Sequence, residues 1–393
     1  MLASFTMDTF IETKVATYTY TRHQATALMD SGLCIASLLM ERQEDVTGEE
    51  TEEELLKDRW IEPAIRLKRG QRVEVRQQLK VGEDGRLYFM TSQAIATKAE
   101  TAESSETLAE AEIVLAIEPE PARWNLNKLS RAGYGDNADL IWGRILELAG
   151  VPEEEHGILI DSFYDWVDED SLETSADGAE TDYYENLEPN PYACKNAALD
   201  TIGELAYIRG FDTNNGVLLK GGIWNPKESE SRQITVSGIE HLFSLYGDGK
   251  INVNAAPREV LLTVPCFEDS DGLIVDTILE EREGLNADSF GASTQVRQTA
   301  RGASLGTAAI EDYSFKDISD FLARIPGISQ EDANTYLTVD CEIYKLELEG
   351  RVGNIRRRAT AIVQRGGSDS KKNSSGLTSA AQDLTILRWQ EEI

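Results

Sequence analysis

The sequence is poor in positive charge, in cysteine and histidine, and in long apolar runs. It has 38 Lys and Arg against 70 Asp and Glu, a formal net charge of −32. Such a balance disfavours sequence-independent binding to nucleic acid, which needs clustered cations on phosphates. Anionic membrane surfaces would repel the chain for the same reason. No run of 18 apolar residues occurs in the printed sequence, so nothing in it reads as a membrane-spanning helix.

The four cysteines and three histidines lie far apart. No C-x-x-C or H-x-x-x-H spacing occurs, which argues against a zinc site. The even cysteine count permits one or two disulfides without requiring any, and Cys194 with Cys266 is the candidate pair.

Hydrophobic periodicity predicts an α+β architecture. Apolar residues from Ala25 to Met40 recur at steps of three and four, which indicates a long helix over residues 5–43. Alternating strand patterns precede residue 125 and return near residue 338, whereas the segment between them is helical. We therefore expect a helical domain inserted between strands of one antiparallel sheet. The expected parts are residues 1–43, 44–124, 125–335 and 336–393.

The amino-terminal helix also indicates a partner surface. Helical phase is already running at Phe5 without a clear capping box, so we expect that Met1 is not the native start. About 20 further apolar residues behind a short basic leader would reach across a bilayer. Small residues let helix backbones approach closely. The residues expected to meet partner helices are Ala25, Leu28, Met29 and Gly32.

A dense acidic segment is the main candidate for chemistry. Residues 153–188 contain fourteen Asp or Glu and no Lys or Arg. A hard cation such as Ca²⁺ would remove their mutual repulsion by taking six to eight oxygen ligands. A solvated acidic loop remains the alternative, since most charge runs have no bound ion.

Enzymatic readings have little support in the sequence. Gly302, Ser304 and Gly306 match the G-x-S-x-G pattern, but the preceding residues are small and polar rather than a buried strand. No two carboxylates stand out as a glycosidase pair. Neither pattern therefore identifies an active site.

Several motifs together resemble a known family, the K-type minor pseudopilins of bacterial type II secretion systems (general secretion pathway protein K). The resemblance is carried by Arg123-Trp-Asn-Leu-Asn127, Ile251-Asn-Val-Asn254, the acidic loop Asp165–Tyr184, and Leu205-Ala-Tyr-Ile-Arg-Gly210. It implies a pilin-like helix on a sheet, with an inserted helical domain. It also implies a calcium site, and the matching ligand candidates are Asp168, Asp170, Glu180 and Asp182.

The function implied by the resemblance is structural, not enzymatic. Such proteins cap the tip of the pseudopilus, join other minor pseudopilins in a heteromeric complex, and help to start assembly for protein export. The implied location is the bacterial inner membrane with a periplasmic domain, the membrane being reached only through an amino-terminal segment missing from this sequence. The alternative is a minor pilin of a type IV pilus-like machine.

Overall fold

The chain forms two compact units, each with its own apolar interior. Unit 1 comprises Met1–Pro119, Ser304–Asp312 and Glu342–Ile393, and unit 2 comprises Glu120–Ala303 and Tyr313–Cys341. The computed structural model describes residues 2–46, 58, 60–81, 87–89, 110–212, 216–225, 233–267, 272–284, 313–366 and 384–392.

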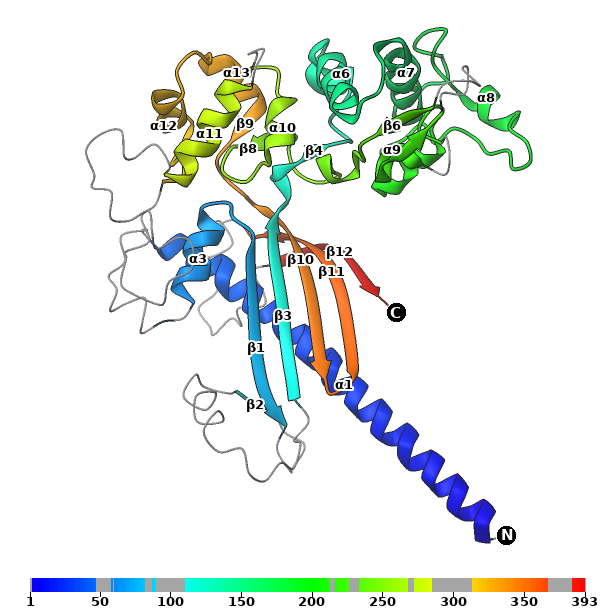
Figure 1. Ribbon diagram of the computed structural model, residues 1–393, viewed down its shortest axis with the longest axis vertical. Helices are drawn as coiled ribbons and strands as arrows, with labels where there is room; N and C mark the ends of the chain where they lie inside the picture. The colour runs from blue at the N-terminus through cyan, green and yellow to red at the C-terminus, as the bar shows by residue number, and fades with distance from the viewer. Residues whose placement is uncertain are drawn as a thin grey trace. The chain divides into compact units, whose positions relative to one another are not determined.

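Unit 1 contains a six-stranded antiparallel sheet (Figure 1). Its strands, in spatial order, are β12 (Leu384–Glu392), β11 (Ile355–Arg365), β10 (Ile343–Val352), β3 (Glu110–Pro119), β1 (Val73–Val81) and β2 (Leu87–Phe89). Alternate residues of β10 are buried, as Tyr344, Leu346 and Leu348 illustrate. Period-two burial of this kind follows from a strand with one face against a core. β3 pairs directly with β10, so unit 2 is inserted in the chain between two adjacent strands.

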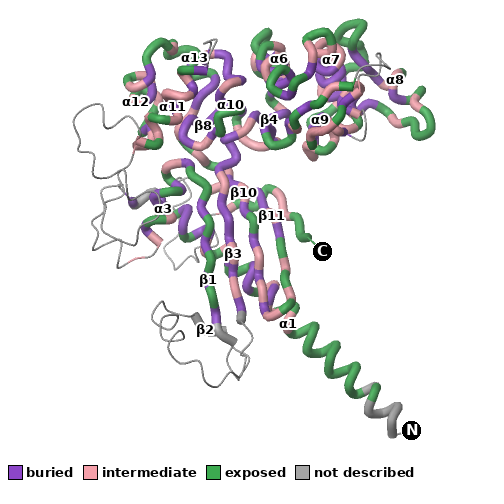
Figure 2. The backbone as a smooth tube through the Cα atoms, viewed as in Figure 1, coloured by how far each residue is buried: buried purple, intermediate pink, exposed green. Residues whose placement is uncertain are grey.

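One long helix, α1 (Leu2–Asp45), packs on this sheet. The packed part of the helix buries Ala25, Leu28, Met29, Ala36, Leu39 and Met40. The part before residue 21 is exposed along its whole described length (Figure 2). The pilin-like α+β fold expected from the sequence is therefore confirmed.

A short helix, α3 (Ile61–Lys68), was not expected from the sequence. It buries Ile61, Ala64, Ile65 and Leu67, and it packs against α1. Eight residues make little more than two turns, too few for a periodic pattern to stand out. Pro63 is tolerated because it lies in the first turn, where no intrahelical donor is lost.

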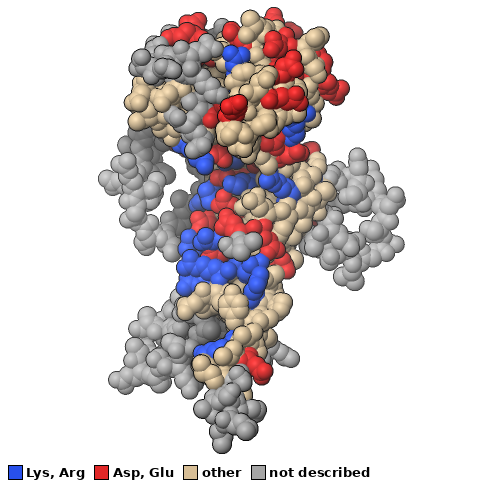
Figure 3. Space-filling view, turned by 90° about the vertical axis from the view of Figure 1, so that its right-hand side faces the viewer, with Lys and Arg blue, Asp and Glu red and all other residues tan. Residues whose placement is uncertain are grey.

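The outward face of the sheet is solvated and carries paired charges. Figure 3 shows Lys and Arg side chains mainly over unit 1, whereas Asp and Glu dominate the visible face of unit 2. Arg358 on β11 forms an ion pair with Glu349 on β10 at 2.7 Å. Exposed pairs of this kind contribute at most about 1 kcal/mol each, so they keep the face soluble more than they stabilise it.

Unit 2 is mostly helical. Its helices are α5 (Arg131–Tyr134), α6 (Asn137–Ala149), α7 (His156–Val167), α8 (Thr181–Glu185), α9 (Val217–Lys220), α10 (Arg258–Leu262), α11 (Leu273–Glu283), α12 (Ile318–Arg324) and α13 (Gln330–Tyr336). Its short strands are β4 (Trp124–Asn125), β5 (Gly222–Trp224), β6 (Ile234–Val236), β7 (Phe243–Ser244), β8 (Ile251–Asn252) and β9 (Leu337–Thr338). Trp142 lies at the centre of its aromatic core, 4.8 Å from the ring of Phe163 and 5.3 Å from that of Phe243.

The ends of unit 2 extend past the expected limits of 125 and 335. Glu120 is buried and accepts a hydrogen bond from the Ser244 hydroxyl at 2.8 Å, which ties the start of the unit to β7. At the other end, β9 pairs in parallel with β8. Among the described helices, none is both long enough and apolar enough to span a bilayer.

Candidate metal centre and partner-binding surface

The acidic loop after α7 is wrapped around one buried carboxylate. Asp165 is fully buried, and its two oxygens accept hydrogen bonds from the backbone N–H groups of Thr174 and Ala179, both at 2.7 Å. Gly178 is required beside it, because a Cβ there would lie 2.1 Å from Asp165 Oδ2. The hydrogen bonds to Asp165 and the absence of a side chain at Gly178 therefore fix the conformation of the loop.

A second set of contacts holds the returning side of the loop. The Arg209 guanidinium donates to the carbonyls of Asp177 and Gly178, at 3.1 and 2.9 Å. The Ser162 hydroxyl, on α7, also donates to the Asp177 carbonyl at 3.3 Å. The Ser162 bond holds the loop against α7, and the Arg209 bonds hold it against a later segment of the chain, so its side chains have a defined geometry.

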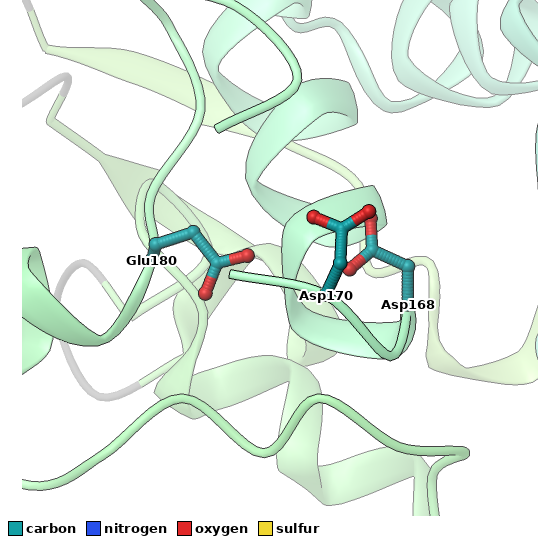
Figure 4. A group of neighbouring side chains, drawn as sticks. All are labelled: Asp168, Asp170 and Glu180. Atoms are coloured by element: carbon teal, nitrogen blue, oxygen red, sulfur yellow. The ribbon is translucent and has the colours of Figure 1, made fainter. Parts of the chain in front are cut away.

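Three carboxylates of this loop converge. Asp168, Asp170 and Glu180 each offer an oxygen within 4.8 Å of the others. Figure 4 shows Glu180 pointing across the loop towards Asp168 and Asp170, which lie together just beyond the end of α7. Asp170 is exposed and Glu180 is buried, so the group opens to solvent on one side. Repulsion between such close carboxylates favours a bound cation or proton.

Oxygen atoms at this group lack hydrogen-bond partners. Asp168 Oδ1 and Glu180 Oε1 are buried without any partner, and so is Oδ1 of the neighbouring Asn196. Buried polar atoms are normally satisfied, and each exception calls for an explanation such as an ion. Carboxylate and carboxamide oxygens are the donors that Ca²⁺ prefers. The residues present therefore fit a hard cation.

Burial and charge raise the pKa of two of these acids. The pKa of Asp168 rises to about 6, first through burial and then through the neighbouring Asp170 and Asp165 carboxylates. Burial is also the main cause that raises the pKa of Glu180, while a hydrogen bond from Asn196 acts in the opposite direction. Without a cation, the protein thus resists holding both groups ionised.

Asn196 was missed by the sequence analysis. Its side-chain amide donates to the Asp170 carbonyl and, at 3.4 Å, to Glu180 Oε2. It adopts a left-handed backbone conformation, φ 46°, which Asn tolerates better than most residues. Because it lies outside the acidic run, no pattern of charge could have linked it to the carboxylates.

Asp182, the fourth ligand candidate, does not join the group. It is exposed in the first turn of α8. An acidic side chain there complements the helix dipole, which is a sufficient structural role.

Two other sequence candidates were a disulfide and a nucleophile elbow. Cys194 and Cys266 are both free thiols, so the expected bond between them is not formed in the structure. The Cys194 thiol instead donates to the Asp165 carbonyl at 3.4 Å. Burial raises the pKa of Cys266 to about 12, the charge of Asp332 adds to this rise, and Arg144 opposes it. The G-x-S-x-G segment, residues 302–306, lies outside the described residues.

The expected partner surface on α1 requires a correction. Ala25, Leu28 and Met29 are at most 2% exposed, and Gly32 is buried as well. A Cβ at Gly32 would lie 2.9 Å from the side chain of Leu348 on β10. These four residues therefore pack on the chain's own sheet and are not available to a partner.

Apart from Leu38, the exposed large apolar residues in the described part of α1 lie earlier in the helix. We call them the amino-terminal apolar surface: Met7, Phe10, Ile11, Val15, Tyr18 and Tyr20, each at least 48% exposed. Met7, Ile11, Val15 and Tyr18 follow one another at steps of four, four and three, so they form one stripe. A continuous exposed apolar stripe of this kind marks an interaction surface.

Comparisons with known proteins bear on the family. Residues 122–216 match the family model described as type II secretion system (T2SS), protein K. No curated protein matches the sequence. Among solved structures, the chain is similar to a chain of the GspK-GspI-GspJ complex from the enterotoxigenic Escherichia coli type 2 secretion system. The identity is 16%, the match covers 75% of this chain and 84% of that chain, and the TM-score is 0.45. This chain therefore carries, over residues 122–216, the domain of type II secretion system protein K, which confirms the resemblance to the K-type minor pseudopilins indicated by its sequence.

Proposed function

We propose that the chain acts at the tip of the pseudopilus, as a minor pseudopilin that helps to start assembly for protein export. The observation that carries this proposal is that one part of α1 is buried on the sheet and another part is exposed. Its carboxyl-terminal part packs on one face of the sheet of unit 1, whereas its amino-terminal part carries an exposed apolar stripe. A pilin-like helix with an exposed apolar stripe is suited to side-by-side packing with other helices of its kind.

The partners in this proposal are other minor pseudopilins. Burying Phe10, Val15 and Tyr18 against apolar helices would remove them from water, at about 1.5–3 kcal/mol for a fully buried large side chain. Association would also stabilise the amino-terminal half of α1, where Thr17, Thr19 and Thr21 are weak helix formers. The proposal includes a periplasmic location for the chain's folded units.

The proposal includes a calcium ion in unit 2. Asp168, Asp170 and Glu180 would hold it through carboxylate oxygens, and Asn196 would add a carboxamide oxygen. The ion would supply positive charge and coordination, not catalysis. The chain's own contribution is a loop fixed by Asp165 and Arg209, which brings together carboxylates that repel one another.

A complementation experiment tests the proposed function. In a strain without the gene, exported substrates of the type II system should accumulate in the periplasm, and the wild-type chain should restore their release. A Val15→Glu, Tyr18→Glu variant should fail to restore it, because charge on the amino-terminal apolar surface blocks helix packing. Leu38→Glu is the matched control, since Leu38 lies on the same helix and is 36% exposed.

The outcomes distinguish the alternatives. Full export by the Val15→Glu, Tyr18→Glu variant would refute the role of the surface. Normal export in the strain without the gene, together with loss of surface pili, would favour the minor pilin of a type IV pilus-like machine instead.

A further inference from the structure

Unit 2 contains the same backbone arrangement twice. β4 pairs in parallel with β7, and β8 pairs in parallel with β9. Each first strand leads into an Asn-x-Asn turn, Asn125–Asn127 in one case and Asn252–Asn254 in the other. The residue between the two asparagines donates its N–H to the paired strand in both copies, to Ser244 at 2.9 Å and to Thr338 at 3.0 Å.

The first asparagine of each turn plays the same part. Asn125 Oδ1 accepts the N–H of Asn127 at 3.0 Å, and Asn252 Oδ1 accepts that of Asn254 at 2.9 Å. The backbone carbonyl of each also closes a turn, accepting from Leu129 and from Ala256 respectively. This side-chain turn is a common use of Asn, and it orients the second asparagine.

The second asparagine of each turn clasps a distant peptide group. Asn127 accepts from the Leu199 N–H at 2.8 Å and donates to the Leu199 carbonyl at 3.1 Å. Asn254 makes the same two bonds with Phe315, both at 2.9 Å. A carboxamide is the side chain that can satisfy a donor and an acceptor of one residue at once.

The two clasps differ in what they hold. Leu199 is three residues beyond Asn196, whose side chain contacts Asp170 and Glu180. Lys195, next to Asn196, is also paired with Glu204 at 2.6 Å, so the two ends of the segment from 195 to 204 are joined to each other. Phe315 instead leads into α12 and packs on Phe321 in the core, far along the chain from any of the three carboxylates.

We propose that Asn127 is a positioning residue for the metal centre, which it influences through Leu199 and Asn196; this inference rests on the proposed calcium binding. Asn127 fixes the backbone from which Asn196 reaches the carboxylates. Removing the clasp leaves all three acidic ligands in place but frees the segment that closes one side of the group. Partners of ligands typically contribute 10- to 100-fold in metal affinity.

The test is a calcium titration of the metal-free full chain by calorimetry, for wild type, Asn127→Ala and Asn254→Ala. Asn254→Ala is a matched control because it deletes the two equivalent hydrogen bonds, to Phe315, in the same unit. We expect Asn127→Ala to bind calcium about 10- to 100-fold more weakly, and Asn254→Ala to bind within about twofold of wild type. Asn127→Asp provides a second variant if Asn127→Ala does not fold. It keeps the acceptor for Leu199 N–H, loses the donor, and should also bind at least about tenfold more weakly.

The result that overturns the inference is wild-type calcium affinity in the Asn127 variants, or an equal loss in Asn254→Ala. A wild-type chain that binds no calcium would refute the proposed metal centre itself, which is a different failure. Hydrogen exchange gives an independent readout: in Asn127→Ala the amides of residues 195–200 should exchange faster, and calcium should slow them less than in wild type.

Discussion

Gly350 on β10 lies directly against the backbone of Ala25 on α1. A Cβ at Gly350 would be 2.0 Å from the Ala25 carbonyl oxygen and 2.8 Å from the Met29 nitrogen. Backbone atoms cannot move aside as a side chain can, so the helix would have to leave the sheet. The approach of α1 to its own sheet thus depends on the absence of one methyl group.

Gly350→Ala should therefore destabilise unit 1, by at least about 1–3 kcal/mol, which is the usual cost of overpacking. The measurement is thermal or denaturant unfolding followed by circular dichroism. Gly143→Ala is the control. Gly143 lies in the middle of α6, and a Cβ there would meet only His156 Nδ1, at 3.9 Å. That change should stabilise unit 2 by about 0.5–1 kcal/mol, the helix preference for Ala over Gly. Two changes of the same sign and size would contradict the close approach.

The sequence predicted α1 and the strands well because their periodicity is long and regular. It could not say what covers the apolar stripe of Ala25, Leu28 and Met29, since packing on a sheet and packing on a partner helix demand the same residues. The residues of the exposed stripe from Met7 to Tyr18 are separated along the sequence by polar residues such as Thr9, Glu12 and Lys14, so they gave no clear signal before the helix was seen. Only the packing of α1 on β10 distinguishes the residues of α1 that cover the sheet from those that stay exposed.

Calcium should raise the melting temperature of the wild-type chain, and chelator should lower it. An ion that binds only the folded state stabilises it by about 2.7 kcal/mol at a hundredfold excess over Kd. The Asp168→Asn, Glu180→Gln variant should lose most of this response, because it removes two of the converging carboxylates. Asp182→Asn should retain it, since Asp182 lies in the same acidic segment but outside the group. Equal responses in the two variants would mean that calcium acts elsewhere or through general screening.

The calcium response should depend on pH in a direction set by Asp168. Its pKa in the folded chain is about 6, above the ordinary value of 3.8, so the folded state holds the proton more tightly than the unfolded state. The contribution of this group to metal-free stability is therefore present below about pH 4 and is lost as the pH rises through 6. Calcium competes with that proton.

The difference in melting temperature between calcium and chelator should accordingly be small at pH 4.5 and large at pH 7.5. Asp168→Asn should reduce this pH dependence because residue 168 no longer titrates. A difference that stays constant between the two pH values would argue against Asp168 as a ligand.

The candidate site was only partly predictable. Asp168 and Asp170 are only two residues apart in an acidic run, so composition and the family resemblance were enough to indicate them. Asp182 was indistinguishable from Glu180 by spacing, yet the start of α8 turns the two side chains apart, and only Glu180 is buried. Asn196 reaches the group through tertiary folding, which no local pattern reports.

The most direct test of the account is the affinity of this chain for the soluble domains of the other minor pseudopilins, measured by sedimentation for wild type, Val15→Glu and Leu38→Glu. We expect wild type and Leu38→Glu to form the same heteromeric complex. Val15→Glu should bind at least about tenfold more weakly, because a buried apolar contact would be replaced by an unpaired charge. All three proteins should give the same circular dichroism spectrum, since Val15 is 58% exposed and contributes little to the fold. Equal affinity of wild type and Val15→Glu would contradict the claim that the amino-terminal apolar surface of α1 joins this chain to its partners.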